Sequence, residues 1–178
     1  MVKKNKWDDK KFVLNALKKN PSCLQFASDN LKNDKEIILR ALKRNKDSLQ
    51  YASLNLKNDK QFMFELVKKN PIYFEYASQN LRNDRDIVLE VIKKNPDYLQ
   101  YASENLKNDK EIVLEAVRKK GILLQYASKK LRKNKKIVLE AIKNDQESFI
   151  VCIQQIERGQ KFYYSNHKGL QISIKIYL

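Results

Sequence analysis

Apolar residues recur along the chain in clusters that are spaced 25 positions apart. Placed on a helical wheel at about 100° per residue, each cluster covers more than half of the circumference, and charged residues fill the remainder. Such a broad apolar stripe predicts a helix that packs against neighbours on both sides. The cluster of the fifth copy consists of Ile112, Val113, Leu114, Ala116 and Val117.

Polar residues mark where this first helix of each copy begins and ends. An Asp precedes the apolar cluster by three residues, and Asp is a favoured N-cap because its carboxylate accepts backbone N–H groups. Asn-Pro pairs at residues 20–21, 70–71 and 95–96 predict the end of the helix and the start of another, with Gly121 at the same joint of the fifth copy. The predicted N-caps are Asp9, Asp34, Asp59, Asp84, Asp109 and, in the sixth copy, Asn134.

A second, shorter helix is expected after each joint, as in Pro96–Asn105 with the sequence PDYLQYASEN. We expect it to end near Asn105, because Asn tolerates the left-handed conformation that closes many helices. One helical hairpin cannot bury its own apolar faces, whereas stacked copies can. The sequence therefore predicts an all-α, right-handed solenoid of six 25-residue helical-hairpin repeats over residues 1–155, with copies starting at residues 6, 31, 56, 81, 106 and 131.

Residues 156–178 change to a two-residue period, which is typical of strands. Ile172, Ile174, Ile176 and Leu178 alternate with polar residues and Tyr177, and Asn166–Gly169 has the composition of a turn. The pattern predicts a short C-terminal β-hairpin or an extended cap. Three interpretations are open: a cap over the last helix pair, a strand edge that pairs with another chain, or a disordered tail.

The formal net charge of +16 favours acidic partners such as nucleic acid, an anionic membrane or an acidic protein. The abundance of Lys and Asn also fits the codon bias of an AT-rich genome, so charge alone does not establish binding. Cys23 and Cys152 stand far apart, without metal-site spacing, which is typical of a reducing intracellular compartment such as the cytoplasm. The N-terminal residues lack the apolar segment of a secretory signal, and no apolar run approaches the length of a membrane span.

The segment LKNDKEIVLEAV followed by LQYAS, repeated every 25 residues, resembles the tandem repeats of the domain of unknown function 4116 family. The resemblance extends from about Lys6 to Gln155 and implies an all-helical repeat array. It also implies an origin among giant viruses, intracellular bacteria or protists, and hence the host cytoplasm or a virion if the protein is viral. It brings no established activity and no catalytic residues.

In a stack of repeats, one repeat position becomes one row of side chains. Two rows near the start of the first helix are basic in every copy that contains them, and we call these eleven residues the basic rim. Two interpretations are open, contact with nucleic acid or another polyanion and a solvated face that keeps the protein soluble. The first row is Lys10, Lys35, Lys60, Arg85, Lys110 and Lys135, and the second is Lys32, Lys57, Arg82, Lys107 and Arg132.

Enzymatic chemistry finds little support in the sequence. His167 is the single histidine, with no Cys or acid placed to form a triad, and three glycines are too few for a phosphate-binding loop. We expect no catalysis, no cofactor and no metal. The favoured function is a non-catalytic interaction scaffold that binds a protein partner through a solenoid surface. The alternatives are a nucleic-acid-binding module that uses the basic rim, and a structural or virion-type assembly component that oligomerises through the C-terminal strand.

Overall fold

The computed structural model describes residues 5–144, 162–165 and 171–174 of the chain. The chain divides into two compact units, Met1–Leu81 and Arg82–Leu178, with the division inside a one-turn helix. The predicted boundary at residues 155 and 156 lies outside the described residues, as do Cys152, His167, Ile176 and Leu178.

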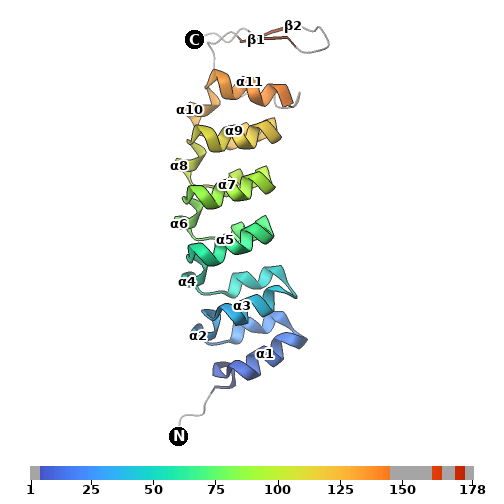
Figure 1. The fold of residues 1–178 in the computed structure, drawn as a ribbon, viewed down its shortest axis with the longest axis vertical. Helices are drawn as coiled ribbons and strands as arrows, with labels where there is room; N and C mark the ends of the chain where they lie inside the picture. The colour runs from blue at the N-terminus through green and yellow to red at the C-terminus, as the bar shows by residue number, and fades with distance from the viewer. Residues whose placement is uncertain (1–4, 145–161, 166–170, 175–178) are drawn as a thin grey trace. The chain divides into compact units, whose positions relative to one another are not determined.

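In the first unit, three long helices alternate with short ones (Figure 1). Asp9, Asp34 and Asp59 each accept backbone N–H groups from the helix that follows, which confirms their predicted role as N-caps. The elements are η1 (Lys6–Asp8), α1 (Lys10–Lys19), η2 (Pro21–Phe26), α2 (Asp29–Lys32), α3 (Lys35–Leu42), η3 (Lys46–Tyr51), α4 (Leu54–Lys57), α5 (Lys60–Lys69) and η4 (Pro71–Tyr76), followed by α6 (Gln79–Arg82) at the division.

The second unit repeats this order, so the tandem helical repeats predicted from the sequence are confirmed. Asp84 and Asp109 cap the long helices of the fourth and fifth copies, and Asn134 accepts the N–H of Ile137 in the sixth. The elements are α7 (Arg85–Lys94), η5 (Pro96–Tyr101), α8 (Glu104–Lys107), α9 (Lys110–Lys119), η6 (Gly121–Tyr126), α10 (Lys129–Arg132) and α11 (Lys135–Asn144).

The prediction of one two-turn second helix was wrong in detail. Residues 96–101 form the 3₁₀ helix η5, Ala102 is extended at φ −63° and ψ 154°, and Ser103 then caps the separate one-turn helix α8. Asn105 lies inside α8 rather than at a helix end. The sequence Tyr-Ala-Ser therefore separates two short helices. The Ser side chain starts the second one, because it accepts the N–H of the residue three positions later.

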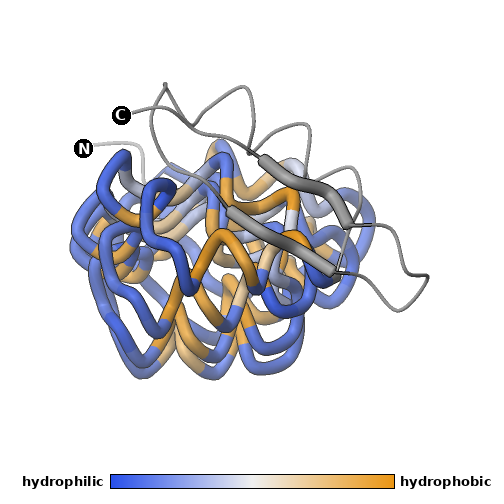
Figure 2. The backbone as a smooth tube through the Cα atoms, turned by 90° about the horizontal axis from the view of Figure 1, so that it is seen from above, coloured by the Kyte–Doolittle hydropathy of each residue, from blue (hydrophilic) through white to orange (hydrophobic). Residues whose placement is uncertain are grey.

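The core lies between successive long helices and the short helices beside them. In the second unit, Val113, Leu124, Ile137 and Val138 belong to one cluster of buried side chains. In the first unit, Val13, Ile37, Met63 and Phe74 are fully buried. Figure 2 shows the apolar positions along the middle of the helices and hydrophilic residues at the turns. The predicted apolar stripe is thus confirmed as the packing face of the long helices.

A ladder of hydrogen bonds joins the one-turn helices within each unit. The backbone N–H of Ser103 donates to the carbonyl of Arg82 over 2.9 Å, and the N–H of Ser128 donates to that of Lys107 over 2.9 Å. The hydroxyl groups of the same serines donate to the Oδ1 atoms of Asn83 and Asn108, both over 2.7 Å. Equivalent hydroxyl bonds in the first unit join Ser53 to Asn33 and Ser78 to Asn58. Within each unit, this ladder fixes the position of each one-turn helix against the one before it.

Two four-residue strands are described in the C-terminal segment. Strand β1 (Phe162–Ser165) pairs antiparallel with β2 (Gln171–Ile174), and Tyr164 stands opposite Ile172. The alternating positions Ile172 and Ile174 of the sequence pattern both lie in β2. A search of the described residues for a helix long and apolar enough to cross a membrane finds none.

Candidate binding surfaces

The first row of the basic rim stands at the first residue of each long helix, and in the first unit Lys10 and Lys35 contact acidic groups of the following copy. Lys10 Nζ lies 2.7 Å from Asp34 Oδ2 and 2.8 Å from Glu36 Oε2. Lys35 Nζ lies 2.6 Å from Asp59 Oδ2. Asp34 and Asp59 are also the N-caps of α3 and α5. Each of them therefore joins two copies and caps the start of a helix. The basic row is therefore used in part for contacts between copies.

The same arrangement holds in the second unit with arginine. Arg85 Nε donates to Asp109 Oδ2 over 3.2 Å, and its Nη2 pairs with Glu111. Burial opposes ionisation of Asp109, but the N–H of Ile112, the guanidinium of Arg85 and the N–H of Glu111 outweigh it, so the pKa of this carboxyl is lowered. The ion pair thus favours the charged form of the cap.

Lys110 and Lys135 differ from these residues. Position 134 holds Asn where the earlier copies hold Asp, and position 136 holds Lys where the second and fifth copies hold Glu. Both lysines are exposed, and among the described residues neither forms an ion pair. The free cations of the first row are therefore concentrated in the last described copies.

The second row is half-buried at the ends of the one-turn helices. Lys57 Nζ donates to the carbonyl of Gln50 over 2.6 Å, and burial lowers its pKa. Lys107 pairs with Glu104 over 2.9 Å, with 16% of its side chain exposed. The guanidinium carbon of Arg82 lies 5.8 Å from the centroid of the Tyr101 ring. Lys32 and Arg132 are likewise half-buried. These side chains cover the short helices and do not form a free cationic stripe.

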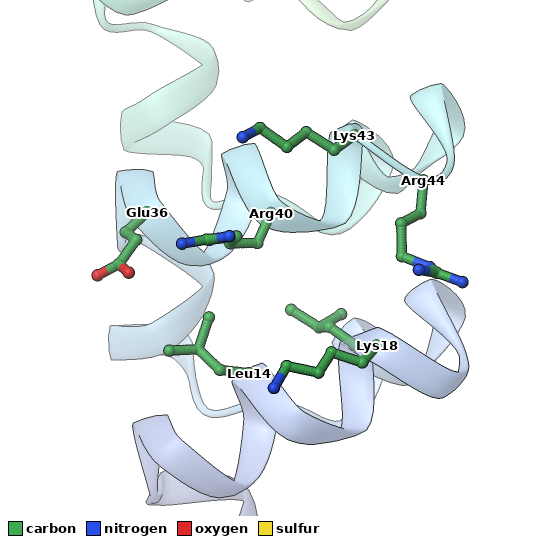
Figure 3. A pocket seen from close by; sticks show the side chains of 7 residues that line it. Leu14, Lys18, Glu36, Arg40, Lys43 and Arg44 are labelled. Atoms are coloured by element: carbon green, nitrogen blue, oxygen red, sulfur yellow. The ribbon is translucent and has the colours of Figure 1, made fainter.

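Two grooves that the sequence analysis missed adjoin α3 in the first unit. The groove between α1 and α3 has a volume of about 570 Å³, and Figure 3 shows Leu14 and Lys18 of α1 facing Arg40 of α3 across it. The groove on the other side of α3 has a volume of about 700 Å³, and its lining residues include Leu39, Leu42, Leu66 and Tyr73. Leu39 is 38% exposed, so the floor of this groove offers apolar surface to solvent.

The rims of these grooves are mainly cationic. Lys18, Arg40, Lys43, Arg44 and Lys69 line them, with Glu36 as the single acidic side chain. Position 40 holds Arg where the later copies hold Glu65, Glu90, Glu115 and Glu140. In the second unit, Glu90 and Glu115 pair with Lys94 and Lys119 of their own helices. Because Arg40 replaces this acid, the cations of α3 lack the compensation that α7 and α9 have. That substitution was the sequence signal for the site.

These features define a tandem helical-repeat protein in which each described copy contributes a long helix that is capped by Asp or Asn and begins with a basic residue. The family model of a domain of unknown function, DUF4116, matches residues 9–57, 42–82, 59–107, 84–132 and 109–152, and the chain belongs to this family. Four of the five matched segments begin at an Asp N-cap, and the longest ones span two copies. Neither a curated protein nor a solved structure matches the chain.

Proposed function

We propose that the chain is a non-catalytic interaction scaffold, and that the face formed by α1, α3 and α5 binds an acidic, amphipathic segment of a partner protein. The observation that carries this proposal is the pair of grooves on either side of α3, with apolar floors and cationic rims. A groove between parallel helices suits an elongated segment, with apolar residues on its floor and acidic residues against its rims.

Charge complementarity favours an acidic partner over a basic one. Among the described residues, Arg40, Lys43 and Arg44 form no ion pair, whereas Glu36 is held by Lys10 over 2.8 Å. An incoming carboxylate therefore meets available cations rather than displacing an internal partner. The exposed part of Leu39 supplies the apolar contact that discriminates a peptide from a simple anion.

The test is selection of a displayed random-peptide library against the full chain, followed by measurement of affinity for an enriched peptide. The proposal expects enriched peptides with acidic and apolar residues in a helical period. Arg40→Glu with Lys43→Glu should weaken binding by about tenfold or more. Lys11→Glu with Lys68→Glu is the matched control, because it makes the same change of formal charge at two exposed lysines of the same unit that line neither groove. Equal binding by the Arg40/Lys43 variant and the unmodified protein overturns the proposal.

The proposal includes a right-handed stack of copies that ends in a β-hairpin cap. Support comes from the antiparallel pairing of β1 and β2. Pairing of a strand edge with another chain is the assembly alternative. Deletion of Gln171–Leu178 should leave the mass in light scattering unchanged if the strands are a cap, and should convert an oligomer to a monomer if they join chains.

A further inference from the structure

The sixth copy departs from the other copies at the positions that surround the start of its long helix. The segment Lys129–Lys136, which spans the junction of the fifth and sixth copies, reads KKLRKNKK, whereas the equivalent segment Glu104–Glu111 at the preceding junction reads ENLKNDKE. Both acids and the capping Asp of that preceding junction are lost, and four of the replacements are lysines, at positions 129, 130, 133 and 136. Codon bias acts on all copies alike, so it does not explain why four such lysines gather in this one segment.

The structure places these lysines on one exposed turn region of the second unit. Lys129 and Lys130 lie in the one-turn helix α10, Lys133 is its C-cap, and Lys135 and Lys136 begin α11. All five are exposed, and among the described residues none of them forms an ion pair. Because α10 is tied by the Ser128 N–H to the carbonyl of Lys107, the turn is held rigidly against the fifth copy.

Lys110 extends this patch onto α9. In the equivalent copies, Lys10 reaches Asp34 and Glu36, and Arg85 reaches Asp109 and Glu111. By the same geometry Lys110 is directed at positions 134 and 136, which hold Asn and Lys. The changes in the sixth copy therefore add cations and also release one that the repeat otherwise neutralises. We call Lys110, Lys129, Lys130, Lys133, Lys135 and Lys136 the α10–α11 patch.

We propose that the α10–α11 patch binds the phosphate backbone of double-stranded nucleic acid, independently of base sequence. This goes beyond the proposed protein-binding function, because it uses other residues in the other unit. Closely spaced lysines on rigid helices match the dense, fixed charges of a duplex, which carries one phosphate per ~1.7 Å of axis. Phosphate contacts alone position a duplex without reading its bases.

The surroundings of the patch favour a duplex over other polyanions. Single strands are bound mainly by stacking on exposed aromatic rings, and membrane surfaces are bound by basic faces that also insert large apolar side chains. Among the described residues, the exposed large hydrophobic side chains are Phe12, Phe26, Leu39 and Leu54, all in the first unit. The ring nearest to the patch in sequence, Tyr126, is half-buried.

The test measures fluorescence anisotropy of a labelled mixed-sequence DNA or RNA duplex with the full chain across a range of salt concentrations. The decisive variant gives the segment Lys129–Lys136 the residues of Glu104–Glu111: Lys129→Glu, Lys130→Asn, Lys133→Asn, Asn134→Asp and Lys136→Glu. Since these residues already occur in a folded copy, we expect unchanged helicity and thermal unfolding. Affinity at physiological salt should fall at least about tenfold, and the log–log salt slope should fall by up to about 3.6 for the four lysines replaced.

The matched control carries the same change of formal charge at exposed lysines elsewhere: Lys11→Asn, Lys19→Glu, Lys68→Glu and Lys93→Glu. It should retain most of the affinity and the salt slope. Equal losses in both variants would mean that net charge rather than the patch attracts the duplex, and would overturn the proposal. So would tighter binding to a single strand, to polyglutamate or to vesicles containing phosphatidylserine than to the duplex. The milder variant Lys133→Gln with Lys136→Gln gives a smaller loss of affinity if the larger one fails to fold.

Discussion

The hydroxyl of Ser103 donates to Oδ1 of Asn83 over 2.7 Å, which joins the start of α8 to the residue after α6 through side chains that lie 20 positions apart in the sequence. The Oγ atom of Ser103 also accepts the N–H of Leu106 over 3.2 Å. Ser103 therefore caps the start of α8 and at the same time holds the turn that contains Asn83. Ser53, Ser78 and Ser128 make the equivalent pair of bonds. One serine in each repeat thus caps the start of a one-turn helix and fixes its position against the preceding one-turn helix.

We expect Ser103→Ala to lower the free energy of unfolding by about 1–2 kcal/mol, because it removes an N-cap and the bond to Asn83. Urea denaturation followed by circular dichroism measures this loss. Asn83→Ala should lose only the second of these interactions, and the double variant should lose less than the sum of the two single variants. Strictly additive losses would show that the bond between Ser103 and Asn83 contributes nothing.

Unlike the capping serines, Ser48 has a hydroxyl group without a hydrogen-bond partner among the described residues. It is 1% exposed, and within the described residues its hydroxyl is the buried side-chain polar atom that has no hydrogen-bond partner. The equivalent positions hold Cys23, Tyr73, Tyr98 and Leu123, so the fold accepts less polar side chains there. We expect Ser48→Ala to raise the free energy of unfolding by about 1 kcal/mol, since it removes an unsatisfied buried group. Urea denaturation that shows a loss instead would mean that the hydroxyl is satisfied in solution.

The long helices were predictable from sequence because three local signals agree. The Asp cap, the broad apolar stripe and the Asn-Pro joint each act within a few residues, and α7 begins and ends where they indicate. The break at Ala102-Ser103 was not predicted, because the Tyr-Ala-Ser segment has the apolar spacing of a continuing helix. Its Ser instead bonds to Arg82 and Asn83 at the end of the preceding one-turn helix, and contacts over 20 positions are not visible in a local pattern.

For the basic rim as well, the sequence pattern did not reveal contacts between residues that are far apart in the chain. The row at Lys10 and Lys35 was regular in sequence, and regularity was taken as a sign of a binding surface. In the structure these residues pair with the acids of the next copy, so regularity reflects the contact that every copy repeats. Departures from the repeat are more informative, because a residue such as Arg40 or Lys136 is not required for stacking. Both proposed surfaces are located at such departures.

The two functions of Asp109 can be separated by substitution. Asp109→Asn keeps an N-cap, as Asn134 does in the sixth copy, but removes the charge that pairs with Arg85. Asp109→Ala removes both and should be less stable than the Asn variant by about 1 kcal/mol, the usual contribution of a cap. Chemical denaturation of the two variants measures the difference. Equal stability would place the whole contribution of Asp109 in its ion pair.

The free energy of unfolding at acidic pH should depend on the Asp N-caps that pair with Lys10 and Lys35. Hydrogen bonds from Lys35 and from the N–H of Phe62 lower the pKa of Asp59 in the folded protein. The pKa of Asp34 is also lowered, because hydrogen bonds from Lys10 and from the N–H groups of Ile37 and Glu36 outweigh the effect of its burial. A carboxyl with a lowered folded pKa binds its proton more readily in the unfolded chain, whose Asp pKa is about 3.9.

The stabilisation that such a carboxyl contributes is therefore present above pH ~4. It is lost as the pH falls through the pKa of the carboxyl in the folded protein. We expect the free energy of unfolding to fall between about pH 5 and pH 2, and Asp59→Asn to flatten part of this fall. Lys35→Met removes the partner of Asp59 and should flatten the same part, so that the double variant adds little beyond either single one. High salt should weaken the effect, because both side chains are partly exposed. Urea denaturation at a series of pH values measures each curve, and parallel curves for Asp59→Asn and the unmodified protein contradict the assignment.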